Sequence, residues 1–303
     1  MKSATQIINY SESFYLSKIH YFKTLKPKIN IHETAFVTAL FRMGDIALSK
    51  DRYAYLWSES SIDVHAKRYS KAVSSYEPYA HCLRNRYFYD TLKKLITQNR
   101  IEVLIHFGCG FSMYPYLLAN SLHYIEIDKS DVVAHKKEMT TIWEGEGKLP
   151  ARNISYLEAD FNLSSQDKLY EQIMALMNGR KSFILLEGVL FFLGKDDKKR
   201  LFELFGKLQE PDEYLGSVSF LPQLEKQFVF KKLIDYVEGN LEKNERFQYQ
   251  TVADEFYLNL KGYELIDHQD TLSLSAYYEP KRILPKEEVL NEHMYLLKKT
   301  CIQ

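Results

Sequence analysis

The sequence has little cysteine, no excess charge of either sign and no long apolar run. Its three cysteines, Cys82, Cys109 and Cys301, are an odd number at wide spacings, which fits neither a disulfide framework nor a Cys-x-x-Cys zinc site. Basic and acidic residues are equal at 40 each, so the chain lacks the cationic surplus that binds nucleic acid or anionic lipid. No segment reaches the roughly 18 apolar residues that span a bilayer. We therefore expect a soluble, cytoplasmic protein with no nucleic-acid or membrane partner.

Aromatic side chains are plentiful by contrast. The chain has 23 tyrosines and 18 phenylalanines among 303 residues, many of them in the first ninety residues and in 214–278. They could line a pocket for a flat or greasy substrate, or they could be ordinary core and half-exposed packing residues. Hydrophobic residues at 46% and charged residues at 26% are typical of a soluble globular protein, with no sign of disorder or low complexity.

Two parts of the chain differ in the spacing of their apolar residues. Residues 1–98 show helical spacing, as in TAFVTALFRMGDIALS from Thr34 and YAHCLRNRYFYDTLKKLI from Tyr79. From Ile101 onward, short apolar runs alternate with helical stretches, which is the pattern of βαβ units. We therefore predict an N-terminal helical cap over residues 1–98 and a Rossmann-like core over residues 99–303.

The core is predicted to contain a seven-stranded sheet. The predicted strands are 101–107, 123–127, 154–157, 182–187, 214–220, 262–268 and 271–278. The first five would be parallel, and the last two would form an antiparallel hairpin because only Gln269 and Asp270 separate them. The long connection before the sixth strand predicts a helical insertion near residues 222–260 that could form a lid. This inventory is that of the class I methyltransferase fold, since a plain dinucleotide-binding fold would normally end with a sixth parallel strand.

A glycine-containing loop follows the first strand. In FGCGFS, Gly108 and Gly110 stand where the chain must turn sharply and where a ligand could approach the backbone. Met113 occupies the place of the third glycine in the dinucleotide fingerprint, and Ser112 that of the last glycine in a Gly-x-Gly-x-Gly loop. The loop is therefore a candidate cofactor loop or a tight structural turn.

Acidic residues stand at the ends of the next three strands. Glu126 could accept both hydroxyl protons of a ribose, with Asp128 as a rival or as the N-cap of the next helix. Asp160 could accept a hydrogen bond from an adenine amino group while Phe161 flanks the ring. Glu187, at the end of the fourth strand, faces the crevice where open α/β sheets bind ligands and could hold an ammonium group or substrate. Together these positions favour a cofactor site more than any one of them does.

These stretches resemble a known family. The runs IEVLIHFGCGFSMYPYLL, HYIEIDKSDVVAHKKEM, YLEADFN and LLEGVLFFLGKDDKKRLFELF, in this order, resemble the leucine carboxyl methyltransferase family, including its bacterial O-methyltransferase branch. TAFVTALFRMGD and RNRYFYDTL are similar to that family's N-terminal segments, so the resemblance covers roughly residues 34–220. It implies S-adenosyl-L-methionine as the cofactor.

The resemblance also implies a role for individual residues. The implied contacts are Arg84 to the methionine carboxylate, Gly108 and Gly110 along the cofactor, Glu126 to the ribose, Asp160 with Phe161 at the adenine, and Glu187 near the methionine amino group. A planar guanidinium suits a carboxylate, although Arg86 is a rival for this role. The family's loop usually continues with an acidic residue, a threonine and an arginine, where Ser112, Met113 and Tyr114 stand here. One wall of the expected pocket therefore differs from the family pattern.

The expected activity is transfer of a methyl group by in-line displacement to a carboxylate or hydroxyl of a small, acyl-type or peptide acceptor. Alignment and exclusion of water would supply most of the rate enhancement. A carboxylate acceptor needs no general base, so no catalytic residue is assigned, although His106 and His268 lie near predicted strand ends or turns. No metal site is expected. The alternatives are a catalytically inactive cofactor-binding or interaction module of the same fold, and an NAD-dependent oxidoreductase.

Overall fold

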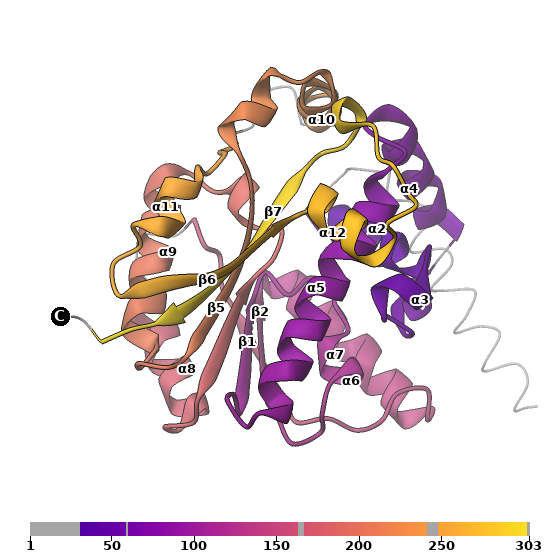
Figure 1. The fold of residues 1–303 in the computed structure, drawn as a ribbon. Coiled ribbons are helices and arrows are strands. Elements are labelled where there is room, and N and C mark those ends of the chain that lie inside the picture. The colour runs from indigo at the N-terminus through magenta and orange to yellow at the C-terminus, as the bar shows by residue number, and fades with distance from the viewer. Residues whose placement is uncertain (1–30, 59, 163–166, 241–247, 302–303) are drawn as a thin grey trace, which may run out of the picture.

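The chain forms an α/β structure around one mixed sheet (Figure 1). The computed structural model describes residues 31–58, 60–162, 167–240 and 248–301, so the first 30 residues of the predicted cap lie outside the described residues. The strands are β1 (Val103–Phe107), β2 (His123–Asp128), β3 (Ile154–Glu158), β4 (Ser182–Leu186), β5 (Tyr214–Phe220), β6 (Tyr263–Asp270) and β7 (Glu292–Lys299). Their order is β3-β2-β1-β4-β5-β7-β6, and β7 runs antiparallel to both of its neighbours.

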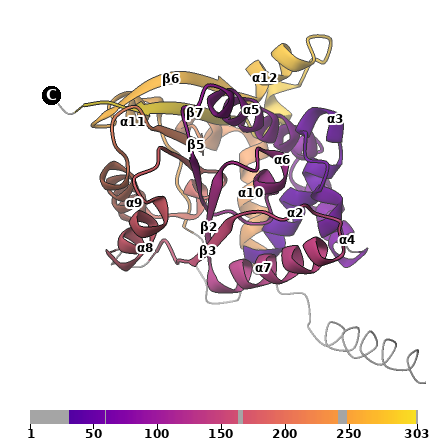
Figure 2. The same cartoon turned by 90° about the horizontal axis from the view of Figure 1, so that it is seen from below.

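Helices cover both faces of the sheet (Figure 2). Every residue of β1 and β4 is buried, as expected for parallel strands with a helical layer on each side. One layer contains α8 (Asp167–Met177), α9 (Lys195–Leu208) and α11 (Asp254–Leu258), and the other contains α5 (Glu77–Thr97) and α7 (Ser130–Gly145). Alternate residues of β1 divide between the two cores: Ile105 packs in the α8–α9 layer and Leu104 in the α5 layer. The sheet thus separates two distinct apolar cores.

The remaining helical segments lie mainly toward the N-terminal part and in the long connection after β5. They are α2 (Ile31–Met43), α3 (Ile46–Ser49), η1 (Ala54–Trp57), α4 (Ser60–Ala72), α6 (Tyr114–Leu117), η2 (Leu190–Phe192), η3 (Pro222–Lys226), α10 (Phe228–Glu238), α12 (Thr271–Tyr278) and η4 (Lys286–Glu288). The insertion expected near 222–260 contains η3, α10 and α11, and its residues 241–247 lie outside the described residues.

The predicted strand 271–278 is wrong, because these residues form helix α12. Asp270 caps this helix: its Oδ1 accepts a hydrogen bond from the Ser273 backbone N–H at 2.6 Å, and the Ser273 hydroxyl oxygen accepts one from the Asp270 N–H at 2.8 Å. This reciprocal cap outweighs the alternating pattern of TLSLSAYY. The seventh strand is instead β7, which inserts between β5 and β6.

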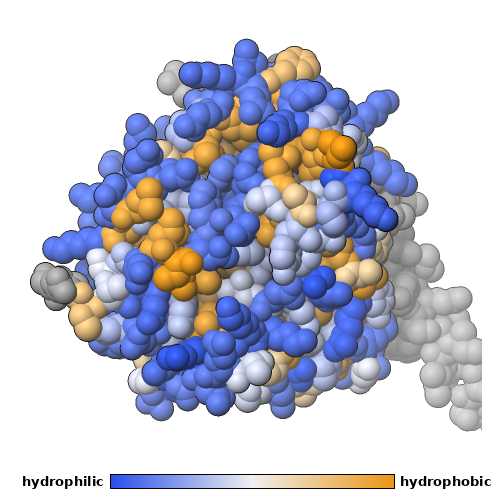
Figure 3. All heavy atoms as spheres, in the orientation of Figure 1, coloured by the Kyte–Doolittle hydropathy of each residue, from blue (hydrophilic) through white to orange (hydrophobic). Residues whose placement is uncertain are grey.

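The edge strand β6 is only partly covered. It lies at the front of the face shown in Figures 1 and 3, where hydrophilic atoms surround separate apolar patches. Within the described ranges, none of the helices combines the length and the apolar character needed to cross a membrane.

The cap of α12 can be tested by substitution. We expect Asp270→Ala to lower the free energy of unfolding by about 1 kcal/mol, because the Ser273 N–H loses its acceptor. Asp270→Asn, which keeps an acceptor oxygen, should cost only a few tenths of a kcal/mol. Urea denaturation followed by circular dichroism measures both. Equal losses in the two variants would contradict a capping role.

Candidate functional site

The glycine loop lies where the strand order reverses. β1 is flanked by β2 and β4, so the chain continues outward from β1 in both directions, and open α/β sheets bind ligands at the carboxyl ends of such strands. Gly108 and Gly110 have φ angles of +71° and +43°, in the left-handed region that favours glycine. The Gly108 N–H donates to the Ile127 carbonyl oxygen at 2.8 Å, which fixes the start of the loop against β2.

Two other segments pack closely on this loop. A Cβ atom added at Gly108 would lie 2.0 Å from Val189 Cγ2, in the segment that follows β4. A Cβ atom added at Gly110 would lie 3.5 Å from the Cβ of Ala35 on α2. The loop is therefore enclosed between the β4 end and the N-terminal helices, and Gly108 has no room for a side chain.

Arg84 and Glu187 meet beside the loop. Arg84 is buried on α5, and its Nε donates to Glu187 Oε1 at 2.8 Å. The Tyr114 hydroxyl donates to the other oxygen, Glu187 Oε2, at 3.1 Å. Burial raises the pKa of Glu187, but the charges of Arg84 and Arg42 outweigh it and lower the pKa overall, so this carboxylate is ionised. The rival Arg86 points elsewhere and pairs with Asp90 at 2.6 Å.

Arg84 is surrounded by more carboxyl groups than its single charge can balance. Its Nη1 donates to Glu292 Oε1 at 2.6 Å, and Glu77 lies about two turns earlier on the same helix. Burial, reinforced by Glu292, raises the pKa of Glu77 to about 8, and burial also raises the pKa of Glu292. Glu292 Oε2 is buried with no hydrogen-bond partner among the described residues. Three buried carboxyl groups around one guanidinium leave the cluster short of positive charge, so it favours protons or a cationic ligand.

His106 borders the same cluster from β1. Its Nδ1 lies 3.2 Å from the Ser112 hydroxyl, and its buried Nε2 has no hydrogen-bond partner in the described part of the chain. Burial, together with the nearby charge of Lys136, Arg42 and Arg84, lowers the pKa of His106 to about 3. The imidazole is therefore neutral near neutral pH and is a poor acceptor of a proton.

The two acids of β2 have different partners. Glu126 is buried, and its Oε2 lies 2.5 Å from Lys136 Nζ on α7. Burial raises the pKa of Glu126, whereas Lys136 opposes this shift. Asp128 does not cap α7, whose N-cap residue is Lys129; its Oδ2 instead accepts a hydrogen bond from the Gly110 N–H at 2.8 Å. Asp128 thus holds the glycine loop, and Glu126 lies deeper in the sheet.

The two predicted site residues beyond β3, Asp160 and Phe161, have different surroundings. Asp160 is exposed, and its Oδ1 accepts hydrogen bonds from the Asn162 backbone and side chain. The Phe161 ring is buried in the α8–α9 core, with its centroid 5.8 Å from that of Phe107. Neither residue contacts the Arg84 cluster in the hydrogen bonds and ion pairs of the described residues.

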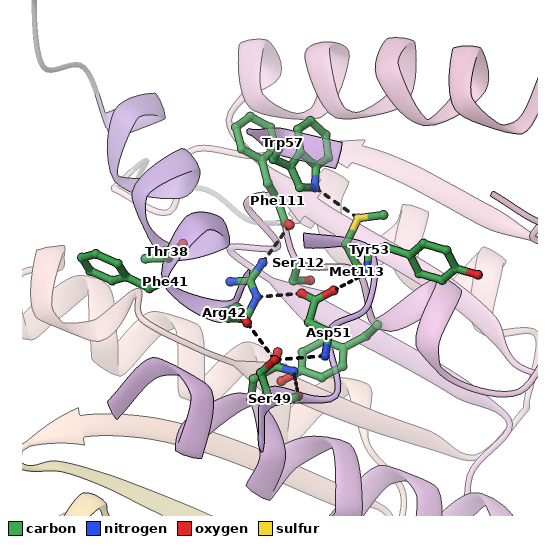
Figure 4. Close-up of polar contacts among 12 residues, drawn as sticks. Thr38, Phe41, Arg42, Ser49, Asp51, Tyr53, Trp57, Phe111, Ser112 and Met113 are labelled. Carbon is green, nitrogen blue, oxygen red and sulfur yellow. Dashed lines mark hydrogen bonds and ion pairs between the residues drawn. The ribbon is translucent and has the colours of Figure 1, made fainter. Parts of the chain in front are cut away.

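An N-terminal clamp, which the sequence did not single out, holds the glycine loop from the other side (Figure 4). Arg42 on α2 is buried; its Nε donates to Asp51 Oδ2 and its Nη2 to the Phe111 carbonyl oxygen, both at 2.9 Å. The Trp57 ring stacks on Phe111 at 4.3 Å, and its Nε1 donates to Met113 Sδ at 3.2 Å. Arg42 stands inside TAFVTALFRMGD, a segment that resembles the family but whose residues have no predicted contact with the cofactor. Its position after an apolar helical stretch was the only signal available.

The residues that depart from the family loop pattern all have internal partners. Ser112 contacts His106, Met113 contacts Trp57, and Tyr114 donates to Glu187. Tyr114 thus supplies a neutral hydrogen-bond donor to Glu187 where the family usually has an arginine. The altered wall is a packed part of the site.

The comparisons with known proteins agree with this architecture. A seven-stranded sheet with this order and one antiparallel strand is the class I methyltransferase fold that the sequence predicts. The family model for leucine carboxyl methyltransferase matches residues 34–206, more than half of the chain. The chain therefore belongs to the leucine carboxyl methyltransferase family.

Solved structures share the fold at low sequence identity. A candidate methyltransferase from Thermobifida fusca YX is 14% identical with a TM-score of 0.61, over 91% of this chain and 96% of that one. A DUF574 family protein from Streptomyces avermitilis MA-4680 is 13% identical with a TM-score of 0.58, over 88% and 97%. A search of curated protein sequences finds no significant match.

The raised pKa of Glu77 predicts a pH-dependent stability. Because the pKa is higher in the folded state than the usual 4.5, the stabilisation from the bound proton is complete below about pH 4.5 and is lost as the pH rises through about 8. We expect the stability of the wild type, relative to Glu77→Gln, to fall by up to about 4 kcal/mol between about pH 5 and about pH 8. Urea denaturation at several pH values measures this difference. A constant difference across the range would show that Glu77 is ionised throughout.

The close contact at Gly108 predicts that an alanine there lowers the free energy of unfolding by more than backbone strain alone would. Gly147 also has a positive φ, +72°, but an added Cβ there meets nothing within 4 Å. We expect Gly147→Ala to cost about 1 kcal/mol and Gly108→Ala about 2 kcal/mol more, because of the collision with Val189. Denaturant unfolding compares the two. Similar losses of stability in the two variants would show that Val189 shifts to accommodate the added methyl group.

Proposed function

We propose that this chain is an S-adenosyl-L-methionine-dependent methyltransferase that acts on an oxygen, a carboxylate or hydroxyl of a small, acyl-type or peptide acceptor. Family membership and fold support the general activity. The observation that carries the proposal is the buried cluster of Arg84, Glu187 and Glu292 at the carboxyl end of β4. It combines a guanidinium with an excess of carboxylates, which suits a ligand that is both a carboxylate and a cation.

The chemistry of this cluster fits the amino-acid part of the cofactor. S-Adenosylmethionine carries a carboxylate, an ammonium group and a sulfonium centre. Arg84 is proposed to bind the carboxylate, and Glu187 to lie near the ammonium group. Glu292, whose Oε2 has no partner among the described residues, adds negative charge that a cation would balance.

The other cofactor contacts are proposed from the family pattern. Gly108 and Gly110 would let the cofactor pass close to the loop backbone, since a glycine has no side chain that would block it. Glu126 is proposed for the ribose, and Lys136, 2.5 Å from its Oε2, offsets part of the cost of burying this carboxylate. Asp160 is proposed for the adenine amino group; its exposure leaves it accessible. Phe161 is proposed beside the adenine, although its ring packs mainly in the core.

The chain's own residues would act by positioning. When bound, the cofactor supplies an activated methyl group that an acceptor oxygen can attack in line. Arg84 and Glu187 would orient the ligand, and the clamp of Arg42, Asp51 and Trp57 would keep the loop rigid and exclude water. A carboxylate acceptor is already ionised near neutral pH, and the low pKa of His106 argues against a histidine base at this site.

Residues 1–98 are proposed to act as a cap over the core of residues 99–303. The contacts of Arg42 and Ala35 with the glycine loop support this role for the described part of the cap. The segment near 222–260 is proposed as a lid. The cytoplasm is proposed as the compartment, because the three cysteines of the chain form no disulfide among the described residues.

Calorimetric titration with S-adenosylmethionine, S-adenosylhomocysteine and NAD tests the cofactor. We expect micromolar binding of the first two, weakened at least tenfold by Arg84→Lys, because a lysine cannot make both contacts of the buried guanidinium. Arg86→Lys is the matched control on the same helix and should bind as the wild type does. Glu187→Gln provides a second variant, and thermal melts show whether each variant is folded.

The outcomes separate the alternatives. Binding of NAD alone, or of no ligand, would refute the proposal. Cofactor binding without methyl transfer to any carboxylate or hydroxyl acceptor would favour the inactive binding module. The internal partners of Ser112, Met113 and Tyr114 would then be the structural basis of the lost activity.

A further inference from the structure

Two histidines and an aspartate meet on the opposite face of the C-terminal strands from the Arg84 cluster. His268 belongs to β6, His293 to β7, and Asp254 is the first residue of α11. Their candidate ligand atoms all lie within 4.8 Å of one another. His268 Nε2 is 2.8 Å from His293 Nδ1 and 3.7 Å from Asp254 Oδ1. Because Glu292 and His293 are neighbours on a strand, their side chains point to opposite faces, so this group is separate from the proposed cofactor site.

A β-bulge brings His268 to this face. Leu265 pairs with Leu297 and Asp267 pairs with the next residue, Leu296, so Ile266 is one extra residue in β6. His268 therefore lies opposite Tyr295. Without the bulge, Ile266 would pair with Leu296, and regular alternation would put Asp267 on the face of Leu265 and turn His268 away. Bulges commonly re-aim side chains next to functional sites. Here the bulge turns an imidazole toward His293.

Neighbouring side chains hold the three groups in place. The Tyr295 hydroxyl donates to Asp254 Oδ1 at 2.6 Å, and the Tyr295 ring stacks on His268 with 4.5 Å between centroids. Asn291 Nδ2 lies 3.4 Å from His293 Nε2. Contacts of this kind orient the ligands of metal ions in proteins.

We propose that Asp254, His268 and His293 bind a divalent transition-metal ion, for which Zn²⁺ is the best match. Imidazole nitrogen and carboxylate oxygen are typical Zn²⁺ ligands at about 2.0–2.2 Å, and two ligand atoms on a tetrahedral ion lie about 3.3 Å apart. The observed separations of 2.8 Å and 3.7 Å lie within about 0.5 Å of that spacing. The three candidate ligand atoms all lie within 4.8 Å, so the remaining Asp254–His293 pair would close by at most about 1.5 Å. The ion would replace the proton that the two imidazoles share. Mg²⁺ and Ca²⁺ prefer all-oxygen sites and are not expected to bind.

The site would have an open position and would join three elements. The side chains of His268 and Asp254 are 31% and 38% exposed, which leaves space for water or another ligand as the fourth group. The ion would link β6 and β7 to α11, the last helix of the segment between β5 and β6. Metal binding would thus fix the end of that segment on the sheet and raise the thermal stability of the protein.

Metal titration of the untagged full chain tests this site. Because Cys301 carries an exposed thiol that could bind Zn²⁺, the experiment uses a Cys301→Ser background. We expect one equivalent of Zn²⁺ by calorimetry, a higher Tm with Zn²⁺ than with EDTA, and a visible Co²⁺ spectrum of a four-coordinate site. His268→Gln, His293→Gln and Asp254→Asn should each weaken Zn²⁺ at least tenfold. His123→Gln, on β2 and bonded to Ser155 and Arg180, is the matched control and should change nothing.

Three results would overturn the proposal. They are the absence of one-to-one binding in the parent chain, unchanged binding in the double variant His268→Gln/His293→Gln, and an equal loss in His123→Gln. Circular dichroism and melting without metal establish that the variants are folded. The Co²⁺ spectrum of the parent chain needs no variant, so a spectrum typical of hexaaqua Co²⁺ also refutes the site if a variant fails to fold.

Discussion

The charge of the Arg84 guanidinium holds together three parts of the chain that are far apart in sequence. It links α5 to Glu187 after β4 and to Glu292 at the start of β7, with both contacts buried. Carboxylates in such a setting are stable only when paired, since an isolated buried charge costs several kcal/mol. Loss of the guanidinium would leave the acids without compensation. The position of α5 on the sheet, the end of β4 and the entry of β7 therefore depend on one side chain.

The glycine loop is held on several sides at once. Asp128 binds the loop backbone from β2, Val189 packs on it from the segment after β4, and Arg42 and Trp57 contact it from the N-terminal helices. A loop restrained in this way loses little further conformational freedom when it binds a ligand, which favours affinity. The N-terminal helices are consequently part of the wall of the site, and their packing bears directly on the conformation of the loop.

The parallel strands were the most predictable part of the fold. Runs such as SFILL are buried on both faces and have few other interpretations in an alternating α/β sequence. The segment TLSLSAYY was misassigned because its alternation mimics a strand, and the cap formed by Asp270 and Ser273 decided the outcome. The true last strand was missed because EHMYLLKK begins with Glu292 and His293, polar residues whose burial depends on partners elsewhere in the chain.

The candidate site was predictable only where its residues follow strands. Glu187 directly follows β4, whereas Glu126 lies within β2, two residues before its end; the structure brings Arg84 to Glu187. The contact between Arg84 and Glu292 spans 208 positions, and inferring it would require placing β7 beside β5 in the sheet. The proximity of His268 and His293 depends on a single extra residue in β6, and no local pattern reveals such a bulge. Sequence periodicity thus locates elements, whereas long-range pairing decides which side chains meet.

The place of β7 has a consequence for how the protein is synthesised. β6 precedes β7 in the chain, yet its only strand neighbour in the described sheet is β7, which lies between β5 and β6. During translation, β6 and the segment before it must wait until residues 292–299 emerge before they can join the sheet. Until then, the edge of β5 and both edges of β6 are open to other chains. A chaperone that shields unpaired strand edges would matter most in the interval before β7 pairs with both strands.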